Sequence, residues 1–131
     1  MSQENVEIVR AGNEAWNRSD MAALRELQDP DVVVRPAPNW PEHGPFVGRD
    51  EVIRFYQGMR DAFDADRLEE IGDPACAGDR VVVRYAWDVA GHGPDTTFEI
   101  TALYGIRTGK VRSVEFFWDH AEALEAAGLS E

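Results

Sequence analysis

Residues 97–118, TFEITALYGIRTGKVRSVEFFW, decide the fold, because apolar and polar side chains alternate on both sides of Thr108-Gly109. Alternation with a period of two is typical of a β-strand that buries one face. A two-residue loop with glycine in second place fits a type I′ turn, which joins antiparallel strands. The stretch therefore predicts a β-hairpin in which Thr97 to Arg107 pairs with Lys110 to Trp118.

The position of the turn predicts which side chains of the hairpin share a face. One face carries the opposed pairs Ile106–Val111, Tyr104–Ser113, Ala102–Glu115 and Ile100–Phe117. The other face carries Leu103, Val114, Phe116 and Trp118, among others. We place the first face inside the fold, because a pocket needs few polar groups among apolar walls. A register shift of one residue would exchange the two faces.

Upstream of the hairpin, the spacing of apolar residues changes near Leu68 from a helical period to a period of two. Helices are predicted over residues 3–17, 21–27 and 50–63, and strands over 32–34, 68–71 and 81–89. Between the first strand and the third helix, Pro36, Pro38 and Pro41 force an irregular loop. This order predicts the α+β class, with a cone-shaped barrel of a curved antiparallel sheet covered by three N-terminal helices and a short C-terminal helix. Residues 1–131 are expected to form a single domain.

The short C-terminal helix has its own start and stop signals. Asp119-His120-Ala121-Glu122 matches a capping box in its aspartate form, and Gly128 suits the left-handed residue that ends a helix. A carboxylate that caps a helix N-terminus has a lowered pKa and is a poor base. We therefore expect Asp119 to be structural.

The charge of the chain limits its partners. Among 131 residues, 25 are acidic and 13 are basic, which gives a formal net charge of −12. Nucleic acids and anionic membrane surfaces attract clustered Lys and Arg, so neither is an expected partner. The single cysteine, Cys76, forms no internal disulfide, and no apolar stretch approaches the roughly 20 residues of a membrane-spanning helix. With an N-terminus unlike a signal peptide, these features predict a cytoplasmic protein.

Five segments of the chain resemble a known family. They are EAWNRSD (14–20), DPDV (29–32), FVGRD (46–50), TGKV (108–111) and FWDHAEALEAAGL (117–129). In them the chain resembles the SnoaL-like polyketide cyclase group of the nuclear transport factor 2-like superfamily. The resemblance implies a cone-shaped α+β barrel and a homodimer paired through the outer sheet face. It also places Asp119 where some cyclase relatives have a functional acid.

The resemblance leaves the activity open, because members include isomerases, dehydratases, cyclases, epoxide hydrolases and binding or scaffold proteins. Those that are enzymes usually work without a metal or an organic cofactor, so we expect no cofactor here. The three histidines, His43, His92 and His120, show no metal-ligand spacing, and we expect no metal site.

Glu115 and Tyr104 are the candidate catalytic residues. In an apolar cone, desolvation would raise the pKa of Glu115 and make it a usable general base near neutral pH. The phenol of Tyr104 on the neighbouring strand would donate a hydrogen bond to a developing enolate. The alternative is that Glu115 pairs with an arginine or lies exposed, as most carboxylates do.

Aromatic side chains form the candidate ligand-binding set. Tyr85 and Trp87 share a strand phase with Val81 and Val83, so they are expected to point inward, where they line a pocket or only pack the core. The other members are Tyr56 on the third helix, Phe117 on the hairpin, and Trp40 and His43 in the proline-rich loop. A loop histidine could shuttle protons, although a single exposed histidine is usually only surface.

Three functions remain open from the sequence. The first is a cofactor-free lyase, isomerase or cyclase that acts on a small hydrophobic carbonyl compound by general acid–base chemistry. The second is a protein that binds a small hydrophobic molecule without turnover. The third is a dimeric interaction module in which Leu103, Val114, Phe116 and Trp118 on the outer sheet face contact a second copy, because such an apolar patch is unusual on a monomer.

Overall fold

The computed structural model describes residues 2–62, 66–89 and 97–129. In chain order the elements are α1 (Ser2–Asn17), α2 (Met21–Glu26), β1 (Gln28–Arg35), β2 (Phe46–Val47), α3 (Arg49–Ala62), β3 (Asp66–Glu70), β4 (Ala75–Ala77), β5 (Arg80–Val89), β6 (Thr97–Arg107), β7 (Lys110–Phe117) and α4 (His120–Ala126). The stretch Gly91–Asp95, whose glycines and proline predict a turn, and the predicted end of the third helix at Phe63 lie outside the described residues. The sequence analysis missed the short strands β2 and β4.

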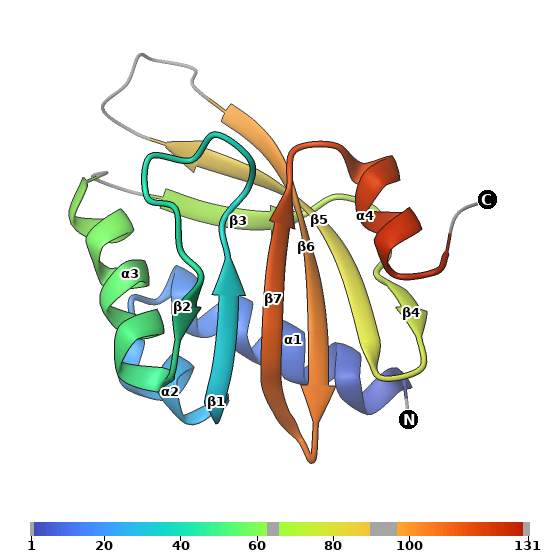
Figure 1. The fold of residues 1–131 in the computed structure, drawn as a ribbon, viewed down its shortest axis with the longest axis horizontal. Coiled ribbons are helices and arrows are strands. Elements are labelled where there is room, and N and C mark those ends of the chain that lie inside the picture. Colours follow the sequence, from blue (N-terminus) through green and yellow to red (C-terminus); the bar gives the residue numbers. More distant parts are fainter. Residues whose placement is uncertain (1, 63–65, 90–96, 130–131) are drawn as a thin grey trace.

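The strands form a single curved, unclosed sheet in the order β2-β1-β7-β6-β5-β3, with β4 paired to β5 (Figure 1). Only one neighbouring pair in this order, β1 and β7, is parallel. Helix α1 crosses one face of the sheet, α2 and α3 pack beside it, and the short α4 packs on the opposite face (Figure 1). The predicted α+β class and its arrangement of helices are confirmed.

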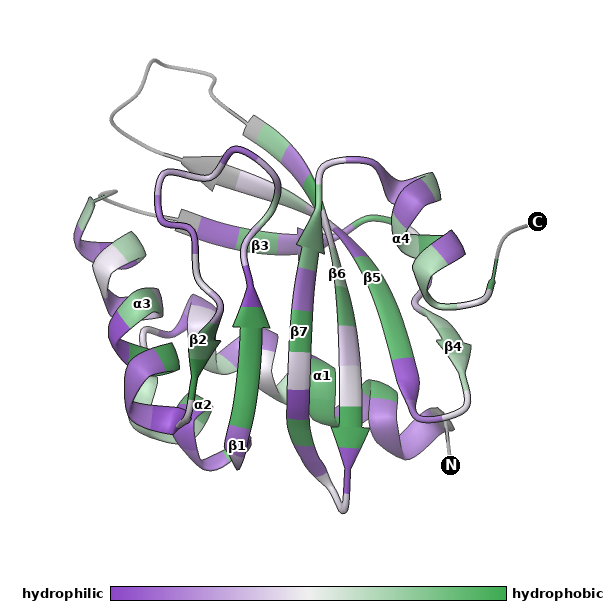
Figure 2. Ribbon diagram, viewed as in Figure 1, coloured by the Kyte–Doolittle hydropathy of each residue, from purple (hydrophilic) through white to green (hydrophobic). Residues whose placement is uncertain are grey.

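Strand β5 explains why the main core lies between the sheet and the first three helices. Val81, Val83, Tyr85 and Trp87 point toward these helices and are at most 5% exposed. Val82 points the other way and packs under α4. Both faces of this strand are therefore buried, and much of β5 has the hydrophobic colour in Figure 2.

The hairpin of β6 and β7 turns where the sequence predicts. Thr108 and Gly109 both have positive φ, +48° and +76°, as a type I′ turn requires. Ile106 lies opposite Val111, also as predicted. Up to this pair, the predicted register is correct.

Beyond this pair, a β-bulge changes the register. Gly105 lies opposite Ser113 rather than Arg112, so β7 carries one extra residue. From there on, Tyr104 pairs with Val114 and Ala102 pairs with Phe116. Val114 and Phe116 therefore face the helices with Tyr104, while the side chain of Glu115 faces the opposite side. The predicted assignment of β7 side chains to the two faces is wrong for this part of the strand.

The bulge also removes the apolar face on which the predicted dimer depended. Val114 and Phe116 belong to the main core, and Leu103 is covered by α4. Trp118 is 41% exposed, but its indole packs near Trp40 at one end of the core face. A homodimer through the outer sheet face stays a prediction, but Leu103, Val114 and Phe116 are covered within the chain and do not form an exposed apolar patch for it.

Helix α4 is capped as predicted. The side chain of Asp119 accepts a hydrogen bond from the backbone N–H of Ala121 at 2.9 Å. At the other end, Gly128 has a φ of +79°, and the N–H of Leu129 donates to the carbonyl of Leu124 at 2.7 Å. These are the bonds of a Schellman motif, so both predicted ends of the helix are confirmed.

Asp119→Ala should lower the free energy of unfolding by about 1 kcal/mol, because the helix loses its N-terminal cap. Urea denaturation followed by circular dichroism measures this change. Asp119→Asn, which keeps a capping oxygen, is the control and should lose much less. Equal losses in both variants would mean that the charge of Asp119, rather than the cap, stabilises the helix.

Candidate ligand-binding site

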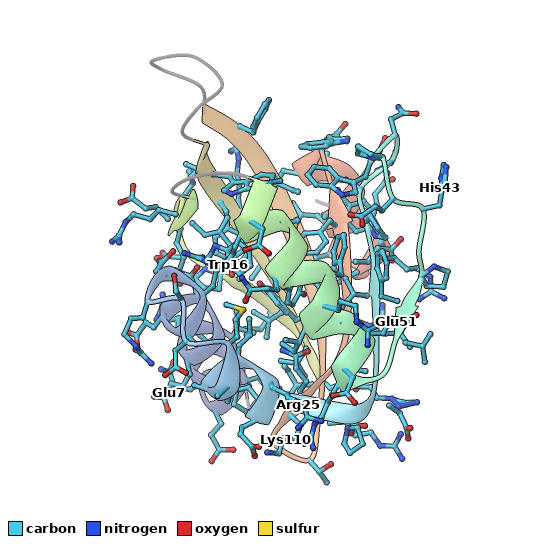
Figure 3. The ribbon with its side chains drawn as sticks, turned by 90° about the vertical axis from the view of Figure 1, so that its left-hand side faces the viewer. Glu7, Trp16, Arg25, His43, Glu51 and Lys110 are labelled. Carbon is cyan, nitrogen blue, oxygen red and sulfur yellow. The ribbon has the colours of Figure 1, made fainter. Side chains whose placement is uncertain are left out.

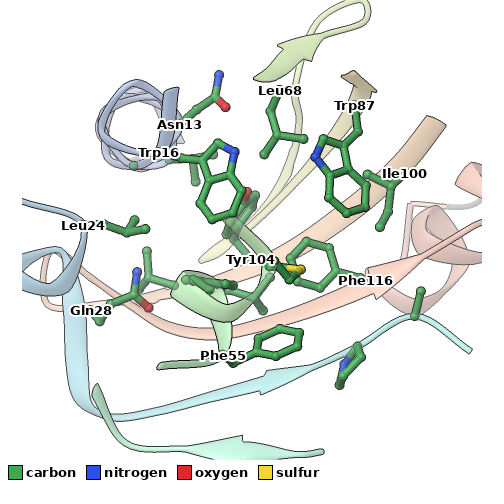
Figure 4. Close-up of a pocket in the computed structure, with 18 of the residues that line it drawn as sticks. Asn13, Trp16, Leu24, Gln28, Phe55, Leu68, Trp87, Ile100, Tyr104 and Phe116 are labelled. Atoms are coloured by element: carbon green, nitrogen blue, oxygen red, sulfur yellow. The ribbon is translucent and has the colours of Figure 1, made fainter. Parts of the chain in front are cut away.

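A cavity lies between the core face of the sheet and helices α1 and α3, with a volume of about 90 Å³ (Figure 4). Its walls come from α1, α2, α3, β1, β3, β5, β6, β7 and the start of the proline-rich loop. The sheet is curved, and the side chains on its concave face do not fill all of the space between the sheet and the helices. The predicted cone interior therefore exists and is narrow.

The cavity walls are mainly aromatic. Trp16 of α1 meets Tyr56 of α3 edge to face, with ring centroids 5.9 Å apart. Phe55, also on α3, stacks on Phe46 at 4.1 Å, which fixes the helix against the edge strand β2. These contacts hold the two helices at a set distance from the sheet. They keep the space open between rigid rings.

Trp40 closes the cavity where it approaches the surface. Its ring lies 5.8 Å from Trp87 and 6.3 Å from Trp118. The indole N–H of Trp118 donates to the backbone carbonyl of Pro38 at 2.7 Å, which holds the loop over the end of β7. Phe98 extends the same cluster and is 45% exposed. This end of the cavity therefore carries a cluster of four aromatic side chains, Trp40, Trp87, Phe98 and Trp118.

A pair of tyrosine hydroxyls lies at the sheet side of the cavity. The hydroxyls of Tyr85 and Tyr104 are 2.8 Å apart and share a hydrogen bond. Tyr104 lines the cavity, whereas Tyr85 is fully buried behind it. Burial raises the pKa of both phenols, and of Tyr56, well above the ordinary value. At neutral pH these groups are hydrogen-bond donors and neither bases nor anions.

Every described residue that lines the cavity is neutral. The described lining can therefore form hydrogen bonds with a ligand. It contains no carboxylate that could accept a proton and no cationic side chain that could bind an anion. A buried ionic ligand would have no partner for its charge there. The cavity suits an uncharged molecule.

The structure brings most of the predicted ligand-binding residues to the cavity. Trp40, Tyr56, Trp87 and the predicted catalytic Tyr104 lie on its walls. Tyr85 does not line it but bonds to the hydroxyl of Tyr104. The alternation of side chains along a strand and the apolar stripe of a helix were sufficient to predict that these residues face the interior.

Three predicted site residues lie elsewhere. Glu115 is exposed, and Phe117 is partly buried beside α4, because the bulge turns both toward the outer face of the sheet. The prediction that these two side chains line the cone is wrong. His43 is exposed in the proline-rich loop and points away from the body of the protein (Figure 3). Glu115 and Tyr104 therefore do not meet, and the proposed acid–base pair has no geometric basis.

Sequence reasoning missed Asn13, Gln28 and Phe116 as cavity residues. Two of them carried a signal. Asn13 lies four residues after Val9 and three before Trp16, so it is a polar residue on the apolar stripe of α1. Gln28 shares the phase of the buried Val32 and Val34 in β1. A polar residue at a buried position is informative, because such residues are mostly exposed.

No three His, Cys, Asp or Glu side chains in residues 2–62, 66–89 and 97–129 lie close enough together to hold a metal ion. None of the helices found there is long and apolar enough to cross a membrane.

Comparison with known proteins gives structural relatives and no curated match. An NTF2-like protein of unknown function from Burkholderia pseudomallei K96243 is 26% identical, with 93% of this chain and 95% of that chain covered and a TM-score of 0.77. A protein from Sinorhizobium meliloti, described as a candidate polyketide cyclase, is 24% identical over 84% of this chain and 93% of that chain, with a TM-score of 0.70. TerC, which was co-crystallised with polyporic acid, is 22% identical over 95% of this chain and 98% of that chain, with a TM-score of 0.77. None of the curated proteins matches the chain.

A family model covers most of the chain. The model of the SnoaL-like domain matches residues 9–114, from the middle of α1 to the middle of β7. This range contains the cavity walls apart from Ile8 and Phe116, which lie just beyond its two ends. The chain therefore belongs to the SnoaL-like family, with the fold of the NTF2-like proteins.

Proposed function

We propose that this protein binds a small, uncharged and largely apolar carbonyl compound in the cavity, with Tyr104 donating a hydrogen bond to the carbonyl oxygen. The observation that carries the proposal is the hydroxyl pair of Tyr85 and Tyr104 at the wall of a neutral cavity. When Tyr85 donates to the oxygen of Tyr104, the proton of Tyr104 is left for the ligand. A carbonyl oxygen accepts such a hydrogen bond, and a molecule with one carbonyl group can otherwise be apolar, as the cavity walls require.

The size of the cavity limits the ligand. A volume of about 90 Å³ is below the roughly 300–1,000 Å³ of sites for drug-sized molecules. A ligand with one aromatic ring would fill the space and push Trp40 outward. Trp40 is the movable part of the wall, because it lies on a loop, whereas the other aromatic walls lie on helices and strands. TerC, which has this fold, was co-crystallised with a small molecule, polyporic acid.

The hydroxyl pair also favours a second candidate, a cofactor-free isomerase, lyase or cyclase. A buried phenol donor that stabilises a developing enolate lowers the barrier of such reactions. In that case, the proton acceptor would come from the substrate or from water, since the described lining holds no carboxylate. Binding without turnover requires nothing beyond the groups in the cavity and is the first candidate.

Isothermal titration with acetophenone and ethylbenzene tests the first candidate, because the two probes differ in the carbonyl group. We expect acetophenone to bind the wild type about fivefold more tightly, the effect of about 1 kcal/mol for a neutral hydrogen bond. Tyr104→Phe should remove this advantage and leave the affinity for ethylbenzene unchanged. Glu115→Gln, on the outer face, is the matched control and should change neither affinity. Equal affinity of the wild type for both probes would contradict the proposal.

A further inference from the structure

We propose that Gln28 forms a second polar subsite in the cavity, which binds a hydroxyl group of the ligand. The inference rests on the proposed function, because it concerns the same cavity and names a further group of its ligand. Gln28 lies at the start of β1 and lines the cavity, whereas Trp16 and Asn13 line it from α1 (Figure 4).

The first evidence is that these residues carry buried polar atoms without a hydrogen-bond partner among the described residues. The atoms are Oε1 of Gln28, Nε1 of Trp16 and Oδ1 of Asn13. Gln28 is 3% exposed and Trp16 is 5% exposed, so water outside the protein does not reach most of either side chain. An unsatisfied buried polar group costs stability, and a native structure contains few of them. Three such atoms around one cavity point to a partner inside it.

The second evidence is that the backbones of Gln28 and Trp16 are held in place from outside the cavity. The guanidinium of Arg60 lies 4.8 Å from the centre of the Trp16 ring and donates to the Trp16 carbonyl at 2.7 Å. The carbonyl of Gln28 accepts a hydrogen bond from Nε of Arg49 at 2.7 Å. Arg49 and Arg60 both belong to α3, so one helix fixes both backbones. Such support is typical of a preorganised binding site.

The kinds of atom determine the group that binds. Oε1 of Gln28 accepts a hydrogen bond, so its partner must carry a proton to donate. A hydroxyl group supplies this proton without bringing a charge. A carboxylate would bring a charge that no cavity residue neutralises, and a methyl group would leave the oxygen unpaired. The expected ligand is therefore a hydroxylated carbonyl compound with an apolar body.

Three probes separate this subsite from the carbonyl site: 4-hydroxyacetophenone, 4-methylacetophenone, which lacks the hydroxyl, and 4-ethylphenol, which lacks the carbonyl. We expect the wild type to bind 4-hydroxyacetophenone about tenfold more tightly than 4-methylacetophenone, because the methyl compound leaves the buried oxygen of Gln28 unpaired. Gln28→Leu should reduce this ratio to about two, with the affinity for 4-methylacetophenone unchanged or higher. Tyr104→Phe should weaken both ketones and keep the ratio.

The results distinguish the two proposals. If the ketones bind with equal affinity to the wild type, or if Gln28→Leu keeps the full ratio, the hydroxyl subsite is wrong and the carbonyl site stands. If 4-ethylphenol binds as tightly as 4-hydroxyacetophenone and loses affinity in Gln28→Leu, the subsite stands and the carbonyl site is wrong. If none of the three probes binds, both proposals are wrong.

A folding control accompanies these titrations. Gln28→Leu replaces a buried unpaired amide by an apolar side chain of similar size, so its melting temperature should equal or exceed that of the wild type. Loss of hydroxyl selectivity in a variant that is at least as stable cannot come from damage to the fold.

Discussion

Val114→Lys should lower the free energy of unfolding by about 4 kcal/mol, whereas Glu115→Lys should change it by less than about 0.5 kcal/mol. Val114 is 2% exposed and packs in the main core. An ammonium group there has no carboxylate in the described cavity lining to pair with. Glu115, the next residue, is exposed on the opposite face, where a lysine remains in water. Guanidinium denaturation of the two variants measures the difference.

The comparison tests the bulge in β7 directly, because the register without the bulge exchanges the two positions. In that register, Val114 faces outward and tolerates lysine, while Glu115 faces the cone. A large loss in Glu115→Lys together with a small one in Val114→Lys would therefore contradict the observed register. Val114→Ile is the matched control for the core position. It keeps the apolar character and should cost far less than the lysine.

Local signals predicted the elements of the fold well. The hairpin turn at Thr108-Gly109 and the cap at Asp119 each depend on a few neighbouring residues, and the structure has both. Helix α1 was predicted within a residue of its observed bounds, Ser2–Asn17, because its apolar stripe extends over four turns. Short-range patterns of this kind need no knowledge of the rest of the chain.

The face assignment failed because a bulge is a small irregularity that alternation alone does not show. Gly105 was the available signal, since glycine inside a strand often marks a bulge or a close approach. A Cβ atom at this position would lie 2.5 Å from Oγ of Ser113, the residue opposite it. The close approach thus explains why glycine suits this place. Phe116 and Phe117 are adjacent and equally apolar, so the sequence there gave no preference for either face.

The candidate site was predicted in part for the same reason. Aromatic residues on regular strands and helices, such as Trp87 and Tyr56, were placed correctly by phase alone. The polar subsite of Gln28 was not predicted, because a neutral amide does not titrate and its residue type alone points to no particular chemistry. An amide side chain at a strand or helix position that faces the interior indicates the polar part of this cavity better than a carboxylate or a histidine does.

The stability of the protein should fall steeply in alkali, because all three of its tyrosines are held in the core face and around the cavity. Burial raises the pKa of Tyr56, Tyr85 and Tyr104 in the folded chain above the ordinary value of about 10. Above that pH the unfolded chain releases three phenol protons that the folded chain keeps. The free energy of unfolding should therefore be independent of these groups below about pH 9 and fall above pH 10, by up to about 4 kcal/mol per pH unit.

Absorbance of phenolate in the near ultraviolet, recorded with circular dichroism along the same pH titration, checks this expectation. In the wild type, the phenolate signal should appear only together with unfolding, since no tyrosine ionises in the folded state near its ordinary pKa. Tyr56→Phe should lower the slope of stability against pH by about one third, because one of three linked protons is gone. A phenolate signal that rises near pH 10 while the circular dichroism of the folded protein persists would show that at least one tyrosine is open to water. If that tyrosine were Tyr104, the hydroxyl pair would not form the buried donor on which carbonyl binding depends.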